Sequence, residues 1–272
     1  MKKIRDYYVQ LIEIIILLFI LCAPAFIDVK GMFEQYVAQT SIDPDNAFLY
    51  ILLQHSNWII GGVFSVIVWW FLIRKYNREN ITMNKANVYH EYPYWWYWFS
   101  AVLLDIRRCN LVNVPIYMQV KLVVNNLFDE FPLDEKSYTE SEDEVKIEKK
   151  NFKKGEEPSE VNLIIEDTYP IENRQIPHEK KHLPTIRIYR EREAGLSRHY
   201  SKHLVDLVAS EVRKLPEKVE LNLYATMNPM NTMYVSKGAF TMANRGNVKH
   251  LYVFQQRHIN GRHFSDKRKK IY

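Results

Sequence analysis

Two long apolar runs dominate the first quarter of the chain. Val9–Ile27 holds two polar residues among its 19, and Trp58–Ile73 holds one among its 16. A helix needs about 20 mostly apolar residues to cross the hydrocarbon core of a bilayer. Polar and basic flanks can extend the second run to that length, because long cationic side chains reach the interface. The pattern predicts a two-helix transmembrane hairpin over residues 1–78, with spans at about 9–27 and 57–75.

The basic residues around these runs predict the orientation of the hairpin. Three Lys or Arg precede the first run and three follow the second, whereas the loop between them carries only Lys30. By the positive-inside rule, both ends of the hairpin lie in the cytoplasm and the loop lies outside. A cleaved signal peptide is the alternative for the first run. Cys22–Ala25 offers no clean cleavage site and a second span follows, so we favour the uncleaved hairpin.

One ionisable residue, Glu13, lies about one turn inside the first apolar run. A carboxylate at that depth is costly unless it faces a pore, a partner or the interface. Snorkelling to the interface is one interpretation. If several hairpins assemble, we expect Glu13 to line a conduit.

Residues 79–131 are expected to form an interfacial and helical connector. Tyr92–Asn110 begins YPYWWYWF, which has seven aromatic residues in eight, and then offers too few apolar residues for a third span. Tyr and Trp favour the headgroup region, which predicts a segment lying on the cytoplasmic surface of the bilayer. A buried aromatic cluster is the alternative. From Pro115 onward, apolar residues recur at helical spacing and predict a helix that packs or contacts another subunit.

Charge dominates residues 132–160. Twelve acidic residues and six lysines fall between Asp129 and Glu160. From Asp134 onward, large apolar residues are so few that the segment cannot bury enough surface to order itself, which predicts a solvated linker. The last 16 residues hold six Lys or Arg and one Asp. This basic tail either touches phosphate groups or keeps the chain end soluble.

Residues 161–272 are predicted to form an α/β domain. Four strand-like runs, VNLIIED, TIRIYRE, VELNLYAT and VKHLYVFQQ, begin at Val161, Thr185, Val219 and Val248. A helix with Ser197 as its candidate cap lies between the second and third runs. Another helix begins at Asn228–Pro229, because Asn is a good cap and Pro suits the first helical position. Strands and helices in this order indicate a right-handed, Rossmann-like parallel sheet.

This fold predicts where a ligand binds. In open α/β sheets, ligands lie beyond the carboxyl ends of the strands, here after Tyr189, Ala225 and Phe254. The amides that start the helix after Asn228 offer an anion site, because a helix N-terminus carries partial positive charge. The geometry nominates these side chains for phosphate or base contacts: Arg190, Arg192, Tyr200, Lys237 and Arg257.

Common catalytic and cofactor motifs are missing from the sequence, namely GxGxxG, GxxxxGK[ST], GxSxG and CxxC. We therefore expect no cofactor and no enzymatic activity. The segment HEKKH, His178–His182, has the spacing of a zinc hydrolase motif. Because prolines at 177 and 184 bracket it, it is too short for a buried helix, and we expect a solvated loop. His178 and His182 remain weak metal candidates, and the two cysteines are predicted to be free thiols.

Four features follow one another in the C-terminal part of the chain: VELNLYATMNP at 219–229, Gly238, VKHLYVFQQ from Val248 and GRHFSDK from Gly261. In this order they resemble the SAVED and CARF families of nucleotide second-messenger sensors. The resemblance implies that a cyclic or linear oligonucleotide is the ligand. Carried over by position, its contacts are Thr226, Met227, Asn228, Met230, Asn231 and Thr232.

The combination of such a sensor with two transmembrane helices resembles the membrane effectors of CBASS and type III CRISPR systems. A full SAVED domain contains two CARF-like halves and this chain has room for about one, so the resemblance implies a homo-oligomer whose subunits complete the pocket. It also implies an antiphage role at the bacterial inner membrane. There, messenger binding would trigger oligomerisation and permeabilisation of the lipid. We expect no duplex nucleic acid among the partners.

Two other kinds of function stay open. One is a membrane-anchored hydrolase, either zinc-dependent through HEKKH or a nuclease that degrades the messenger. The other is a membrane scaffold whose α/β domain binds a protein partner.

Overall fold

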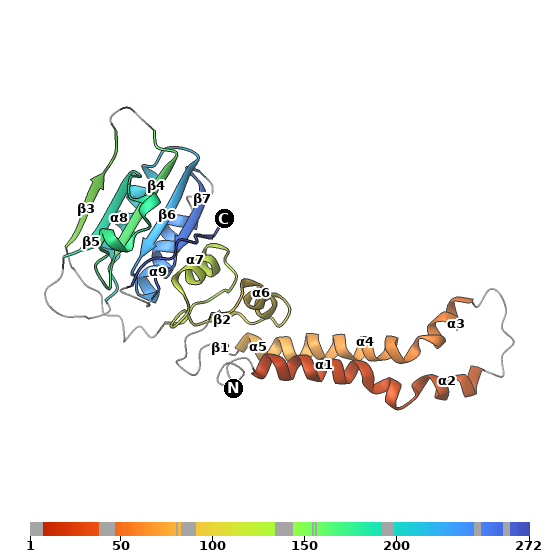
Figure 1. The fold of residues 1–272 in the computed structure, drawn as a ribbon. Helices are drawn as coiled ribbons and strands as arrows, with labels where there is room; N and C mark the ends of the chain where they lie inside the picture. The colour runs from red at the N-terminus through yellow and green to blue at the C-terminus, as the bar shows by residue number, and fades with distance from the viewer. Residues whose placement is uncertain are drawn as a thin grey trace. The chain divides into compact units, whose positions relative to one another are not determined.

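The structure of the chain, a computed structural model, describes residues 8–37, 47–79, 81–82, 91–133, 144–153, 155, 157–191, 199–241, 246–257 and 262–272 (Figure 1). These residues form two compact units. The first comprises Met1–Ala86 with Trp95–Cys109, and the second comprises Asn87–Tyr94 with Asn110–Tyr272. Arg192 and Ser197, which the sequence nominated as a ligand contact and a helix cap, lie outside the described residues.

Helices make up most of the first unit. They are α1 Tyr8–Phe26, α2 Val29–Val37, α3 Ala47–Gln54, α4 Ser56–Val68, the π-helical turn η3 Trp69–Ile73, and α5 Arg74–Glu79. Two helical stretches are long and apolar enough to cross a membrane, Tyr8–Glu34 with 27 residues and Ser56–Arg78 with 23. A turn at residues 27–28 separates α1 from α2 within the first stretch. The predicted two-helix hairpin is therefore confirmed as a pair of apolar helices.

The helices α1 and α4 pack against each other in antiparallel directions. Ser65 Oγ donates a hydrogen bond to the carbonyl of Leu17 at 3.1 Å. Four residues earlier in α4, Gly61 approaches Leu21 so closely that a Cβ there would lie 2.1 Å from the Leu21 carbonyl oxygen. Because one residue number rises as the other falls, the two contacts define the antiparallel register. Glycine is required at this crossing, since any larger residue would push the backbones apart.

The aromatic stretch of the connector forms helix α6, Tyr94–Val102, near the short parallel pair β1 Ile81–Thr82 and β2 Arg108–Cys109. Tyr97 is fully buried, whereas Trp95 and Trp98 are exposed. The stretch therefore combines a buried face with exposed indole rings. Its location at a membrane surface stays a prediction.

A six-stranded mixed sheet forms the second unit, with strand order β3-β5-β4-β6-β7-β8. The strands are β3 Val145–Lys150, β4 Glu160–Glu166, β5 Thr185–Arg190, β6 Val219–Ala225, β7 Val248–Phe254 and β8 Lys269–Lys270. The four central strands run parallel, as predicted from the sequence, and β3 and β8 add antiparallel edges. The expected purely parallel sheet is thus a mixed sheet dominated by parallel strands.

Helices cover one face of this sheet and an irregular loop covers the other (Figure 1). The main core joins the sheet to α7 Ile116–Val124, α8 Lys202–Arg213, α9 Pro229–Val235 and the π-helical turn η7 Ser236–Phe240. On the other face, two isoleucines from the β4–β5 connection pack on Ile164 and Tyr224. Right-handed crossovers that move in opposite directions across a sheet lie on opposite faces. The β4–β5 connection moves one way, and the connections through α8 and α9 move the other.

Strand β3 corrects the prediction of an unordered linker across residues 132–160. Val145–Lys150 pairs antiparallel with β5 over its whole length. Its alternation of apolar and charged residues suits an edge strand, which needs only one buried face. Lys149 of this strand forms an ion pair with Glu211 of α8, with Nζ 2.6 Å from Oε2. The sequence of residues 132–160 predicted disorder because the partners of its charged side chains, such as Glu211 for Lys149, are distant along the chain.

Glu211 makes the attachment of β3 sensitive to acid. Burial favours a raised pKa for Glu211, but hydrogen bonds and charges from Lys149 and Lys214 outweigh it and hold the pKa below the ordinary 4.5. A carboxylate with a lowered folded-state pKa stabilises the fold above its unfolded pKa, and this contribution disappears as the pH falls through the folded value. We expect the protection of the β3 amides against hydrogen exchange, measured relative to the intrinsic exchange rate at each pH, to fall as the pH drops below about 4.5.

Glu211→Gln is expected to remove that acid-dependent component while leaving slower exchange in β6 unchanged. An exchange profile of β3 with the same pH dependence in both proteins would contradict the assignment. Asp206→Asn, at an exposed position of the same helix, is the control.

Candidate functional site

The chain reverses its direction across the sheet between β4 and β6, which lie side by side. Such a topological switch point opens a crevice at the carboxyl ends of the strands, where ligands of α/β proteins bind. Asp167 follows β4 directly, and Thr226 follows β6. Arg190 is the last residue of the neighbouring strand β5. Strand order therefore brings three loops together that are far apart in the sequence.

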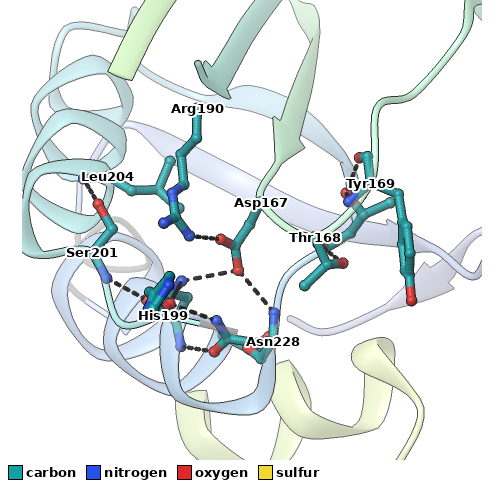
Figure 2. A network of polar contacts seen from close by, with 11 residues as sticks. Asp167, Thr168, Tyr169, Arg190, His199, Ser201, Leu204 and Asn228 are labelled. Carbon is teal, nitrogen blue, oxygen red and sulfur yellow. Dashed lines mark hydrogen bonds and ion pairs between the residues drawn. The ribbon is translucent and has the colours of Figure 1, made fainter. Parts of the chain in front are cut away.

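Asp167 is the centre of a buried polar network at this edge (Figure 2). Its Oδ1 accepts a hydrogen bond from Arg190 Nη1 at 2.6 Å. Its Oδ2 accepts from the backbone amide of Asn228 at 3.0 Å and from Asn231 Nδ2 at 2.9 Å. Asp167 is 2% exposed and Arg190 is 7% exposed. A buried ion pair is tolerated only when its remaining hydrogen-bonding capacity is also satisfied, and the two asparagines do this for the carboxylate.

The same asparagines join the starts of α8 and α9. The side-chain amides of Asn228 and Asn231 both donate to the carbonyl of His199, at 2.8 and 3.0 Å. Asn231 Oδ1 accepts from the amide of Ser201, whose own hydroxyl caps α8 by accepting from Leu204 N. Helix α8 is thus capped by Ser201. The network fixes both helix starts relative to the carboxyl end of β4.

Thr226 ties the loop after β4 to the loop after β6. Its hydroxyl donates to the Tyr169 carbonyl at 2.6 Å, and its carbonyl accepts from both the amide and the hydroxyl of Thr168. Figure 2 shows Thr168 and Tyr169 on the far side of Asp167 from His199. The two loops are therefore held together on both sides of the carboxylate.

The residues nominated from the sequence divide into an inner and an outer group. The inner group is buried within the protein: Arg190, Thr226, Met227, Asn228, Asn231 and Thr232. The outer group reaches the surface: Tyr200, Met230 and Lys237. The carboxylate of Asp167 occupies the anion position expected at the start of α9, since the Asn228 amide donates to it. The inner group positions the loops, whereas the side chains of the outer group are accessible at the surface.

Tyr234 is a member of the outer group that the sequence analysis missed. Its ring lies 4.9 Å from that of Tyr200, tilted by 47°. Tyr234 is 37% exposed and precedes Lys237 by nearly one helical turn. Its spacing of four from Met230 was the available signal, because residues four apart share one side of a helix. Asp167, an acid just beyond an apolar strand, was not nominated from the sequence as a ligand contact.

Arg257 lies in the wall of a separate cavity. This cavity has a volume of about 520 Å³ and borders the cluster around Tyr224 on the face of the sheet that carries the irregular loop. Basic and imidazole side chains prevail in its lining, among them Arg174, His178, Lys181, Arg257 and His263. The predicted order of strands placed Arg257 near Asn228 at the carboxyl ends of the strands. Among the described residues, however, no hydrogen bond joins Arg257 to the Asp167 network.

The zinc alternative gains no support from the described residues. His178 starts a three-residue 3-10 helix, His178–Lys180, and His182 lies beyond its end. The two imidazoles therefore do not share the face of an α-helix that the HExxH spacing requires. Within the described part of the chain, no group of three His, Cys, Asp or Glu side chains is placed to hold a metal ion.

In the first unit, Glu13 faces other parts of its own chain. Its carboxylate accepts a hydrogen bond from Asn77 Nδ2 at 3.2 Å, and Asn77 Nδ2 also donates to the carbonyl of Leu104. Glu13 is 6% exposed. The sequence analysis considered two positions for this carboxylate, at the membrane interface or lining a conduit. The structure adds a third, a hydrogen bond within the same chain. A role in a conduit of several hairpins stays a prediction.

Asn228→Ala is expected to lower stability by about 1–2 kcal/mol, because a helix cap is lost. The Asn228 side chain accepts from the amide of Asn231, so the substitution also leaves that buried amide without its partner. Hydrogen exchange of the loop after β6 measures the effect. Asn125→Ala, which removes an exposed hydrogen bond to Lys121, is the matched control and should change exchange little. Equal effects of both substitutions would contradict the structural role of Asn228.

Comparison with known proteins assigns the chain to a family. All of it, residues 1–272, matches the family described as "SMODS- and Ubiquitin system-associated 2TM effector domain". No curated protein matches. Two solved structures of an Acinetobacter baumannii Cap4 SAVED/CARF-domain containing receptor are similar, one with the cyclic trinucleotide 3'3'3'-cAAA and one with 2'3'3'-cAAA. They are 12% and 13% identical, with a TM-score of 0.41 each, and the matches cover 64% of this chain and 40% of the receptors.

That TM-score is too low to carry the assignment, whereas the family match extends over the whole chain. It agrees with the two apolar helices and the α/β unit that follows them. The chain is a membrane-associated effector and belongs to the SMODS- and ubiquitin system-associated two-transmembrane effector family.

Proposed function

We propose that the α/β unit binds a cyclic or linear oligonucleotide second messenger and that binding activates the hairpin as a membrane-permeabilising antiphage effector. The single observation that carries the proposal is the match of the whole chain to a family of two-transmembrane effectors. An effector of this kind needs a signal, and the second unit has the architecture of a ligand-binding α/β domain. The resemblance of residues 219–229 to SAVED sensors suggests that this signal is an oligonucleotide.

The messenger is proposed to lie on the outer group of residues at the switch point. Tyr200 and Tyr234 form an aromatic pair on which a base can stack, a contact worth about 1–3 kcal/mol per base. The ammonium of Lys237, one helical turn beyond Tyr234, supplies a cation for a phosphate. Met230, four residues before Tyr234, offers an adaptable apolar contact. The buried Asp167 network keeps these side chains on rigid helix starts.

Activation is proposed to proceed through assembly. A single half-sized sensor leaves part of an oligonucleotide uncovered, so a second copy of the chain completes the pocket. The messenger shifts the equilibrium toward the assembly only if it binds the assembly more tightly than the resting state. Both termini are proposed to lie in the cytoplasm of a bacterial cell, with the hairpin in the inner membrane.

Titration of the full chain in detergent with cyclic di-, tri- and tetranucleotides tests the sensing step. A ligand at a hundredfold excess over its Kd stabilises its receptor by about 2.7 kcal/mol, which a thermal shift detects easily. We expect Tyr234→Ala to weaken binding about tenfold or more, because one stacked base is lost. Lys237→Glu should weaken it further and make the dependence on salt shallower, because one contact between a cation and a phosphate is lost.

Lys249→Glu is the matched control, since Lys249 is an exposed lysine at the opposite end of β7. The effector step is read from dye release in vesicles that contain the purified chain. Absence of a thermal shift with every oligonucleotide tested would sink the sensing step. Messenger binding without dye release would reject the permeabilising step alone.

A further inference from the structure

The base of the hairpin carries a cavity that the proposed function does not use. It has a volume of about 420 Å³ and lies between α1, α4 and the end of α6. Its lining is Ile14, Leu17, Leu18, Leu21, Ser65, Val66, Trp69, Phe99, Leu103 and Leu104. The polar atom of Ser65 is engaged, because its hydroxyl donates to Leu17. Apolar cavities of about 150 Å³ stay dry and take up benzene, so this groove, named here the acyl groove, has room for a longer hydrocarbon.

A cluster of arginines adjoins the acyl groove. The guanidinium of Arg74 lies 5.1 Å from the Trp69 ring centre and 4.7 Å from that of Trp70. Trp69 lines the groove and donates its indole N–H to the carbonyl of Leu103 at 2.5 Å. The cation is therefore held over a ring that forms part of the groove wall. An acyl chain in the groove would bring its polar end close to this guanidinium.

Arg74 and Arg78 of this cluster share a single carboxylate oxygen. Arg74 Nε and Arg78 Nε both donate to Asp105 Oδ2, at 3.3 and 2.5 Å, and Arg107 Nε lies 3.6 Å from Oδ1. Burial favours a raised pKa for Asp105, but hydrogen bonds and charges of Arg78 and Arg74 outweigh it and lower the pKa, so the carboxylate is charged at neutral pH. Three cations thus surround one anion. An arginine that uses Nε still has four N–H donors, which suit a phosphate.

Exposed indole rings lie in the same unit as this cluster. Trp70, Trp95 and Trp98 are all exposed in the first unit. Tryptophan prefers the headgroup region, because its ring is apolar with one polar N–H. These features match the parts of a phospholipid. The groove suits an acyl chain, the cationic cluster suits the phosphate, and the exposed indoles suit the region of the headgroups.

We propose that the base of the hairpin binds one anionic phospholipid, with an acyl chain in the acyl groove and its phosphate on Arg74 and Arg78. This site is independent of the messenger, and it would make the hairpin sensitive to the lipid composition of its membrane. Charge complementarity selects the occupant, since a zwitterionic lipid brings a cation toward the arginines.

Native mass spectrometry of the delipidated full chain, titrated with phosphatidylglycerol or phosphatidylcholine of identical acyl chains, tests the proposal. We expect one tightly bound phosphatidylglycerol and weaker phosphatidylcholine. Arg74→Gln should weaken phosphatidylglycerol binding about fivefold, the effect of about one cation near a lipid surface. Lys75→Gln removes the same charge from the adjacent exposed position of α5 and should change binding little.

A second pair of variants tests the acyl groove. Val66 lies in the groove wall and is 57% exposed, whereas Val63 is 54% exposed on the same helix and lies outside the wall. Val66→Trp is expected to reduce binding of both lipids by filling the groove, and Val63→Trp to leave it unchanged. Equal binding of the two lipids to the unmodified chain would overturn the anionic site. If Val66→Trp changed the oligomeric state but not lipid binding, the groove would belong to a second copy and the proposal would be rejected.

Discussion

Asp167→Ala is expected to destabilise the α/β unit by about 3–5 kcal/mol, the cost of leaving one partner of a buried ion pair unpaired. Arg190 would keep its charge in a position that is 7% exposed, with its hydrogen bond to Asp167 lost. The amide of Asn228 and the side chain of Asn231 would also lose their common acceptor. Hydrogen exchange of β4 and β6 in the full chain measures the loss. Messenger binding should weaken in parallel, because the outer residues depend on these loops.

Two further variants distinguish the loss of the ion pair between Asp167 and Arg190 from the effect of any substitution on stability. Asp206→Ala removes an exposed carboxylate from α8 and should change exchange in β4 by less than about 0.5 kcal/mol. Asp167→Ala combined with Arg190→Met removes both charges and should recover part of the stability, since apolar replacements of a buried pair are often tolerated. If the double variant were as unstable as the sum of the single variants, the two residues would not act as a pair.

Gly61→Leu is expected to separate α1 from α4 and to destabilise the hairpin by about 1–3 kcal/mol, the usual cost of overpacking. The clash cannot be relieved by a change of rotamer, because the atom that a Cβ would meet is the backbone carbonyl oxygen of Leu21. The hydrogen bond from Ser65 to Leu17, one turn away, would be broken by the same separation. Loss of helical signal on heating in detergent, with slower migration of the chain in a denaturing gel, measures the effect.

Gly62→Leu is the control for this experiment, since nothing lies within 4 Å of a Cβ at Gly62. Both substitutions add the same side chain to adjacent positions of α4, so they change hydrophobicity equally. A hairpin that tolerated both substitutions would contradict the close crossing at Gly61. In vesicles, Gly61→Leu should also abolish dye release, whereas messenger binding by the α/β unit should persist.

The central strands could be predicted because each is a short apolar run with its own turn signals. The runs from Val161, Thr185, Val219 and Val248 became β4, β5, β6 and β7. The cap at Asn228 was predicted for the same reason, since the residues that it contacts follow within one turn. Strand β3 was missed because Lys149 finds its partner Glu211 62 residues later in the chain, and no local pattern encodes that pairing.

In the candidate site, too, the sequence identified individual residues but not the contacts between distant segments. Asn228 and Asn231 were nominated from the sequence as ligand contacts, but the structure buries them against Asp167, and Asn231 lies 64 residues from it. No local pattern identifies the partners of Asp167, because the order of strands in the sheet decides which loops meet. Tyr234 became a candidate only when the turn of α9 placed its ring beside Tyr200.

By itself, the sequence determined the two apolar helices, the alternation of strands and helices, and the Asn228 cap that starts α9, whereas it placed the cap of α8 at Ser197 instead of Ser201. These features depend on hydrophobic periodicity and on residues within one or two turns, so the chain encodes them locally. The tertiary structure alone decided that Asp167 would neutralise Arg190, that Glu13 would pair with Asn77, and that three arginines would gather around Asp105. Those groups carry charges or strong dipoles, and only contacts between distant segments fix which partners they find.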